Sequence, residues 1–337
     1  MTLIRPPAEG TDASGPARRR ATARAVAVLA LVAGAALIPL LGPRTALDGT
    51  GEAAAPGVGG IALLRAVLFT ALCVPAGELF VARLARRVPG APLADVPRSW
   101  APRTAAAGFV AALGLASVVA TGNLLPHHLS DLDLGGLYRT RDGKLALLEV
   151  NAFAAAWLCA RSRRPGTQVW PLAVLVVAEA LRAHPATEHG PLVGSGLTLL
   201  HVTCAALWAG GLLHVLRMLR RWRPSAAGAA LLGLYARVAA VLFAAITATG
   251  TWSALRRMPP GTVLDQLTAT AYGRTLLAKV LLVAVVAVLA LCARLRLRRA
   301  ADPLSAYAPA RAEVVALGAV VVVSAVLTAL PLPIRWS

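Results

Sequence analysis

The sequence predicts an all-α protein that crosses a membrane many times, and three observations support this. Of the 337 residues, 58% are hydrophobic and only 15% are charged, whereas a typical soluble domain has about 25% charged residues. The mean hydropathy is +0.68. Arginines collect on every second connection between long apolar stretches, which is the pattern of loops retained on the cytoplasmic side of a membrane. We therefore expect a multi-pass protein of a bacterial cytoplasmic membrane.

About nine apolar stretches approach the roughly 20 residues that a membrane-spanning helix needs. The fourth and fifth of them are short. An N-terminus in the cytoplasm would place the arginine-rich loops inside and the C-terminus outside. The expected spans lie near 24–42, 61–82, 104–124, 145–160, 168–182, 192–216, 228–254, 272–293 and 312–331.

The N-terminal segment is expected to be a disordered, basic cytoplasmic tail over residues 1–23. Its arginines at 18–20 and the apolar run that follows also resemble a signal peptide. No clear small-residue cleavage site precedes Pro43, so we expect a retained first span. The formal charge of +19 does not predict nucleic-acid binding, because the arginines form small groups at helix ends, where lipid headgroups and topology explain them.

A weak internal repeat, offset by roughly 130 residues, organises the chain. It predicts four plus four spans in parallel orientation with a ninth appended. The first unit, 24–182, would be the degenerate copy, and the second would cover 183–337. The matching segments are 120–122 with 248–250, 142–144 with 272–274, and 158–161 with 291–294.

The sixth span contains His201, Cys204 and Trp208 at positions i, i+3 and i+7, on one face of a helix. Histidine and cysteine ligate soft or borderline metals such as copper. Gly210 and Gly211 would permit close approach of another helix. The alternative is a packing face with a hydrogen-bonded histidine.

Histidines also occur on the loops expected outside. His184 and His189 precede the sixth span, and His127 and His128 precede the fourth. A metal captured there could pass to His201, roughly ten residues or about 15 Å below the outer end of its helix. His127 and His128 could equally be solvated loop residues.

One lysine, Lys279, lies well inside an expected span, and the repeat offset aligns it with Glu149. We expect these two side chains to form an intramembrane ion pair, since pairing relieves part of their desolvation cost. A lysine close to His201 would repel a bound cation. It would suit proton coupling, an anion or a haem propionate better.

No enzyme is predicted. The four cysteines lie one to a helix without a CxxC pair, and no GxSxG, HExxH or phosphate-binding loop is present.

The second half resembles the copper-resistance protein D family of inner-membrane proteins (CopD/PcoD). The resemblance runs from about His184 to Pro333. It rests on the segments 201–211, 235–237, 249–250, 272–279, 311–313 and 330–331. It implies a functional core drawn from His201, Trp208, Gly210, Gly211, Thr249, Gly250, Tyr272, Gly273 and Lys279.

The resemblance also implies copper homeostasis, with uptake of a copper ion, Cu(I) or Cu(II), from the outer face. A CopC-like copper-binding partner would be a separate protein, because the loop at 43–60 is too short for a fused domain. In this hypothesis His184 and His189 recruit the metal, and His201 with Cys204 binds it in the membrane. Two alternatives are a haem-binding redox protein with His201 as axial ligand and an assembly factor that delivers copper to a respiratory oxidase.

Overall fold

The predicted all-helical fold is confirmed. The structure, a computed structural model, describes residues 14–122, 124, 128, 133–184, 190–222, 225–258, 260–299 and 307–332, and these contain helices but no strand. The long helices are α1 (Ser14–Leu47), α2 (Val58–Ala85), α3 (Ala101–Thr121), α5 (Arg141–Arg161), α7 (Pro191–Trp222), α8 (Ala226–Arg257), α10 (Ala271–Arg299) and α11 (Tyr307–Ala329). The shorter ones are α4 (Leu134–Arg139), η2 (Pro165–Gln168), α6 (Val169–Arg182) and α9 (Val263–Ala269).

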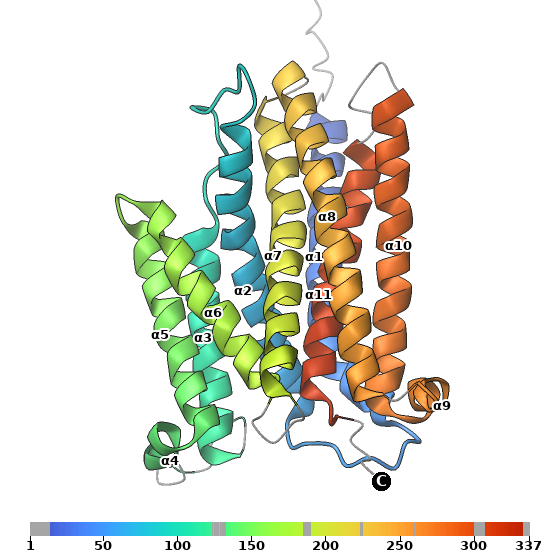
Figure 1. Cartoon of the computed structure of the whole chain (residues 1–337). Helices are drawn as coiled ribbons and strands as arrows, with labels where there is room; N and C mark the ends of the chain where they lie inside the picture. The colour runs from blue at the N-terminus through green and yellow to red at the C-terminus, as the bar shows by residue number, and fades with distance from the viewer. Residues whose placement is uncertain are drawn as a thin grey trace, which may run out of the picture.

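Within the described ranges, eight helices are long and apolar enough to cross a membrane. Each of the nine expected spans coincides with a helix, but the fifth corresponds to α6, which has only 14 residues. At 1.5 Å per residue α6 is about 21 Å long, which is less than the roughly 30 Å of a hydrocarbon core. Although it is short, α6 runs along the bundle at a tilt and does not lie across its end (Figure 1).

The two ends of the bundle carry different loops (Figure 1). We call one the arginine-rich end, because it carries the connections at 86–100 and 162–168 and the end of α7 with Arg220 and Arg221. The opposite end carries α4 and α9. Arginines at the opposite end bind backbone carbonyls: Arg141 donates to His184 O (3.1 Å) and Arg257 to Ala183 O (3.2 Å). These arginines therefore hold the end of α6 in place.

Helices α2 and α7 cross in closest contact near the middle of the bundle, and glycines make this crossing possible. A Cβ atom on Gly77 would overlap the backbone of Gly210, and one on Gly210 would overlap the carbonyl of Cys73. Helix α3 packs on the outside of α2, and α8 packs on the outside of α7. The α2–α7 pair is thus the axis on which the other helices are arranged.

The same turn precedes α5 and α10. The hydroxyl of Thr140 accepts a hydrogen bond from the backbone N–H of Gly143 (3.1 Å), and that of Thr270 accepts one from Gly273 (3.0 Å). Such side-chain caps satisfy donors that a helix start leaves unpaired. A Cβ atom on either glycine would overlap the backbone of the preceding short helix, α4 or α9.

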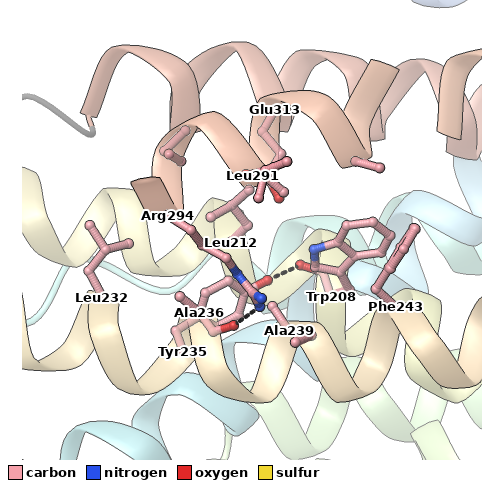
Figure 2. Close-up of a pocket in the computed structure, with 15 residues that line it drawn as sticks. Trp208, Leu212, Leu232, Tyr235, Ala236, Ala239, Phe243, Leu291, Arg294 and Glu313 are labelled. Atoms are coloured by element: carbon pink, nitrogen blue, oxygen red, sulfur yellow. Dashed lines mark hydrogen bonds between the residues drawn. The ribbon is translucent and has the colours of Figure 1, made fainter. Parts of the chain in front are cut away.

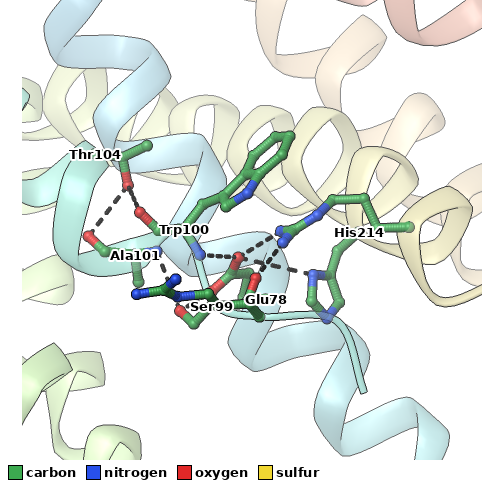
Figure 3. Close-up of polar contacts among 8 residues, drawn as sticks. Glu78, Ser99, Trp100, Ala101, Thr104 and His214 are labelled. Atoms are coloured by element: carbon green, nitrogen blue, oxygen red, sulfur yellow. Dashed lines mark hydrogen bonds and ion pairs between the residues drawn. The ribbon is translucent and has the colours of Figure 1, made fainter. Parts of the chain in front are cut away.

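At the arginine-rich end, a buried carboxylate fixes the 86–100 connection to the α2–α7 pair (Figure 3). Glu78 accepts hydrogen bonds from Arg217 of α7 (2.7 Å) and from the backbone N–H of Trp100 (2.8 Å). The Arg217 guanidinium also lies 3.9 Å from the centroid of the Trp100 ring. His214 joins the cluster, with Nδ1 3.9 Å from Glu78 Oε1.

Candidate functional site along helix α7

The imidazole of His201 lies between α7 and α8. Its Nδ1 is 3.0 Å from the hydroxyl oxygen of Thr249. A Cβ atom on Gly250 would lie 3.3 Å from the ring carbon Cε1, so this glycine leaves room for the imidazole. Thr249 and Gly250, which the sequence singled out separately, therefore form the wall against which His201 packs.

The hydrogen bonds of Thr249 favour one tautomer of His201. The Thr249 hydroxyl donates to Ala245 O at 2.7 Å, and a hydroxyl has only one hydrogen to give. When the hydroxyl donates to Ala245 O, Thr249 accepts from His201, and Nδ1–H is the donor of the neutral ring. The lone pair is left on Nε2. A histidine oriented in this way by a bond to its other nitrogen is the arrangement found at many metal ligands.

Lys279 of α10 is partly buried and lies within electrostatic range of the His201 ring. It forms no ion pair with an acidic side chain of the described residues. Its positive charge opposes the residence of a cation at His201, as expected from the sequence.

The expected Glu149–Lys279 ion pair is not seen in the part of the chain that the structure describes. Glu149 pairs instead with Arg182 of α6, with 2.9 Å between Oε2 and Nη2. Helices α5 and α6 pack directly against each other, whereas α5 has no comparable packing with α10. The pairing is therefore made with the adjacent helix and not across the repeat.

His184 lies over the same face of α7 as His201. Its Nε2 is 2.9 Å from the hydroxyl oxygen of Thr198, and its ring rests on Gly194, where a Cβ atom would overlap it. Gly194, Thr198 and His201 are at positions i, i+4 and i+7, so they share one face of the helix. His184 is buried, with 2% of its surface exposed, rather than solvated on a loop.

The other predicted metal ligands are placed less closely together. His189 and His127 lie outside the described residues, and His128 is exposed. Cys204 follows His201 by one helical turn and is 6% exposed. In the ranges that the structure describes, no group of three or more His, Cys, Asp and Glu side chains could hold a metal ion.

Trp208 continues the stripe below Cys204 and contacts α8. Its carbonyl accepts a hydrogen bond from the Tyr235 hydroxyl (2.6 Å), and its ring meets Phe243 edge-on with centroids 5.4 Å apart. Gly211 admits Tyr235, since a Cβ atom there would lie 2.8 Å from the tyrosine ring. Gly210 faces α2. The two glycines therefore serve different neighbours.

Tyr272 and Gly273 lie at the opposite end of the bundle, away from this stripe. The Tyr272 hydroxyl accepts a hydrogen bond from Arg257 (3.1 Å), and Arg257 also holds Ala183 at the end of α6. Gly273 belongs to the turn between α9 and α10. Both residues therefore connect helices at that end of the second half.

Sequence reasoning missed several buried charged residues. Arg65 pairs with Glu179 at 2.8 Å, next to the Glu149–Arg182 pair. Glu313 is buried on α11, with 5% exposed. Ionisable residues inside apolar spans are costly and are seldom placed there without a role, so a search for acidic residues within the nine spans could have found Glu78, Glu179 and Glu313.

Residues 229–328 match the sequence profile of the family described as Copper resistance protein D. The match covers nearly all of α8, then α9 and α10, and most of α11, and it includes Thr249, Gly250 and Lys279. It begins after α7, so it does not include His201. No curated protein and no solved structure matches the chain. The resemblance to this family is confirmed for the matched region.

Proposed function

We propose, from the premise of a multi-pass membrane protein whose residues 229–328 are of the copper resistance protein D type, that this chain takes up copper across a bacterial cytoplasmic membrane. The observation that carries the proposal is the contact of His201 Nδ1 with Thr249 of the matched region, which leaves the lone pair on Nε2 when Nδ1 carries the proton. Neutral imidazole with a free nitrogen is a good ligand for copper.

The order of residues on α7 supports a path for the metal. His184 at the opposite end would receive the ion, His201 would bind it one helical turn further on, and Cys204 would take it another turn inward. Histidine and cysteine side chains both suit copper, and thiolate favours Cu(I). His189, which lies outside the described residues, would help His184 to recruit the metal. A separate CopC-like protein could deliver the metal to the same end.

Lys279 fits this proposal as a residue that keeps the binding reversible. A site that conducts an ion must bind it well enough to admit it and weakly enough to release it. The lysine charge near His201 lowers the affinity for a cation. It does so without occupying either ring nitrogen.

The two halves of the chain would be repeats of one unit that now have different functions. The turns at Thr140–Gly143 and Thr270–Gly273 are alike, and α2 and α7 meet at a pair of glycines. Arg65 takes the place of His201 in the first half and is held by Glu179. The first half would then be a closed scaffold and the second half the copper path, with the arginine-rich end in the cytoplasm.

The test is copper binding to the purified full-length protein. His201→Gln keeps an amide that can bond to Thr249 but removes the imidazole, so bound copper should be lost. Thr249→Val keeps the imidazole but removes its anchor, and the copper affinity should fall by about 10–100-fold, as for other residues that orient a ligand. His214→Gln, the same change further along α7, is the matched control and should bind copper normally.

Copper accumulation in cells should be normal in His214→Gln, reduced in Thr249→Val and lost in His201→Gln. Unchanged copper binding in His201→Gln would contradict the proposal. A Soret band in the absorption spectrum of the wild type, lost in His201→Gln, would replace it with the haem alternative. Normal accumulation together with loss of respiratory oxidase activity would favour the assembly factor.

A further inference from the structure

A cavity of about 200 Å³ opens between α7, α8, α10 and α11 in the half of the bundle nearer the arginine-rich end (Figure 2). Alanines of α8 and α10 form much of its wall. In the first half, α3 and α5 pack closely, but α8 and α10 have no comparable contact. The small side chains and the separation of α8 from α10 together create the space. Leu291 on its rim is 56% exposed, so the cavity reaches the lipid-facing surface.

Four polar groups face this cavity, one from each helix: Trp208, Tyr235, Arg294 and Glu313. The Tyr235 hydroxyl is used by the carbonyl of Trp208, and Arg294 donates to the carbonyl of Ala236. The indole N–H of Trp208 is buried and has no hydrogen bond of normal geometry to a described residue, although it lies near Glu313. The Trp208 indole and the Glu313 carboxyl are therefore neighbours in the wall of the cavity.

Glu313 is the acidic residue of the cavity. It is 5% exposed, and no arginine, lysine or histidine of the described residues lies within ion-pair distance. The charged or titratable groups that act on it are Arg294 from α10 and Tyr235 from α8, and Trp208 faces it from α7. By contrast, Glu149 and Glu179 in the first half each have an arginine partner.

A carboxylate in this setting suits a proton better than a metal ion. A buried charge without a partner is costly, and protonation removes that cost. A metal ion would need further ligands, and those facing Glu313 across the cavity are donors, namely the Arg294 guanidinium and the Trp208 indole. Arg294 would also repel the metal. Its charge does not act on a neutral carboxylic acid.

We propose that Glu313 binds and releases a proton through this cavity, which lies in the half of the bundle nearer the arginine-rich end. A space of this size holds several water molecules, each of about 30 Å³, which could bond to the Trp208 indole and carry the proton. The inference rests on the proposed function in one respect: the proton would be the one that moves with copper. The copper stripe and the cavity share α7, with Trp208 about 10 Å of helix rise from His201.

The test uses the purified full-length protein without copper and the apolar reagent dicyclohexylcarbodiimide. A protonated carboxyl adds to it: the acid proton goes to a carbodiimide nitrogen, the carboxylate oxygen bonds to the central carbon, and rearrangement gives a stable N-acylurea. Mass spectrometry of the peptides should show this label on Glu313, increasing as the pH is lowered. Glu179, which is paired with Arg65, should remain unlabelled, and Glu313→Gln should lose the label.

A second variant separates the cavity from the residue. Ala290→Phe fills the space from α10 and keeps the carboxylate, so the label on Glu313 should be lost while the protein remains monodisperse. An unlabelled Glu313 in the wild type, or equal labelling of Glu179 and Glu313, would overturn the inference. If Glu313 is labelled as expected but His201→Gln binds copper normally, the proposed copper site fails and the proton site stands.

Discussion

At the scale of single residues, two sets of polar side chains inside the bundle differ from each other. In the first half, Arg65, Glu149, Glu179 and Arg182 form ion pairs at 2.8 and 2.9 Å. In the second half, His201 is held by a hydroxyl, and Lys279 and Glu313 have no ion-pair partner among the described residues. Paired charges stabilise an arrangement, whereas unpaired ones can change their ligand or proton. This contrast is the reason for placing function in the second half.

The Glu149–Arg182 pair gives a prediction for stability. Glu149→Gln leaves the Arg182 charge buried without its partner, and breaking a buried pair in this way costs about 3–5 kcal/mol. The double variant Glu149→Gln, Arg182→Gln removes both charges and should recover much of the loss. Thermal unfolding in detergent measures both effects. If Lys279→Gln, and not Arg182→Gln, recovers the stability lost in Glu149→Gln, the Glu149–Lys279 pair predicted from the sequence would be correct.

At the scale of helices, the crossing of α2 and α7 depends on Gly77 and Gly210, where there is no room for a Cβ atom. Small residues let helices approach closely in membranes. The same principle does not apply to every glycine of α7: a Cβ atom on Gly196 would meet nothing within 4 Å. The position of a glycine in the sequence is therefore less informative than the helix that it faces.

Two glycine-to-alanine variants on α7 should differ for this reason. Gly210→Ala forces a methyl group into the backbone of α2, and overpacking of this kind costs about 1–3 kcal/mol. Gly196→Ala should be neutral or slightly stabilising, because alanine favours helix more than glycine does. Unfolding temperatures of the two variants compare them directly. Equal stability would mean that α2 and α7 do not cross at this point.

At the scale of the whole molecule, the arginine distribution gives the bundle a direction. Loops rich in arginine stay in the cytoplasm, so we expect the cavity beside Glu313 to lie nearer the inside and His184 nearer the outside. The arginines at the opposite end do not conflict with this, since Arg141 and Arg257 bind loop carbonyls there. The direction of the proposed copper path depends on this orientation.

Labelling of single cysteines in intact cells tests the orientation. Leu93, on the 86–100 connection, and Leu264, on the short helix α9 at the other end, are exposed by 48% and 80%. A membrane-impermeant maleimide should label Leu264→Cys from outside and should reach Leu93→Cys only after the membrane is permeabilised. The wild type controls for the four native cysteines. The reverse pattern would invert the protein in the membrane and the direction of uptake with it.

The sequence by itself determined the helices, the two unlike ends and the stripe of His201, Cys204 and Trp208, because apolar length, loop charge and helical period are all local properties. Only the tertiary structure decided that Thr249 anchors His201, that Glu149 pairs with Arg182, and that Glu313 faces a cavity. The physical reason is that helical period tells which side chains share a face, but the partner of that face is set by packing between helices far apart in the chain.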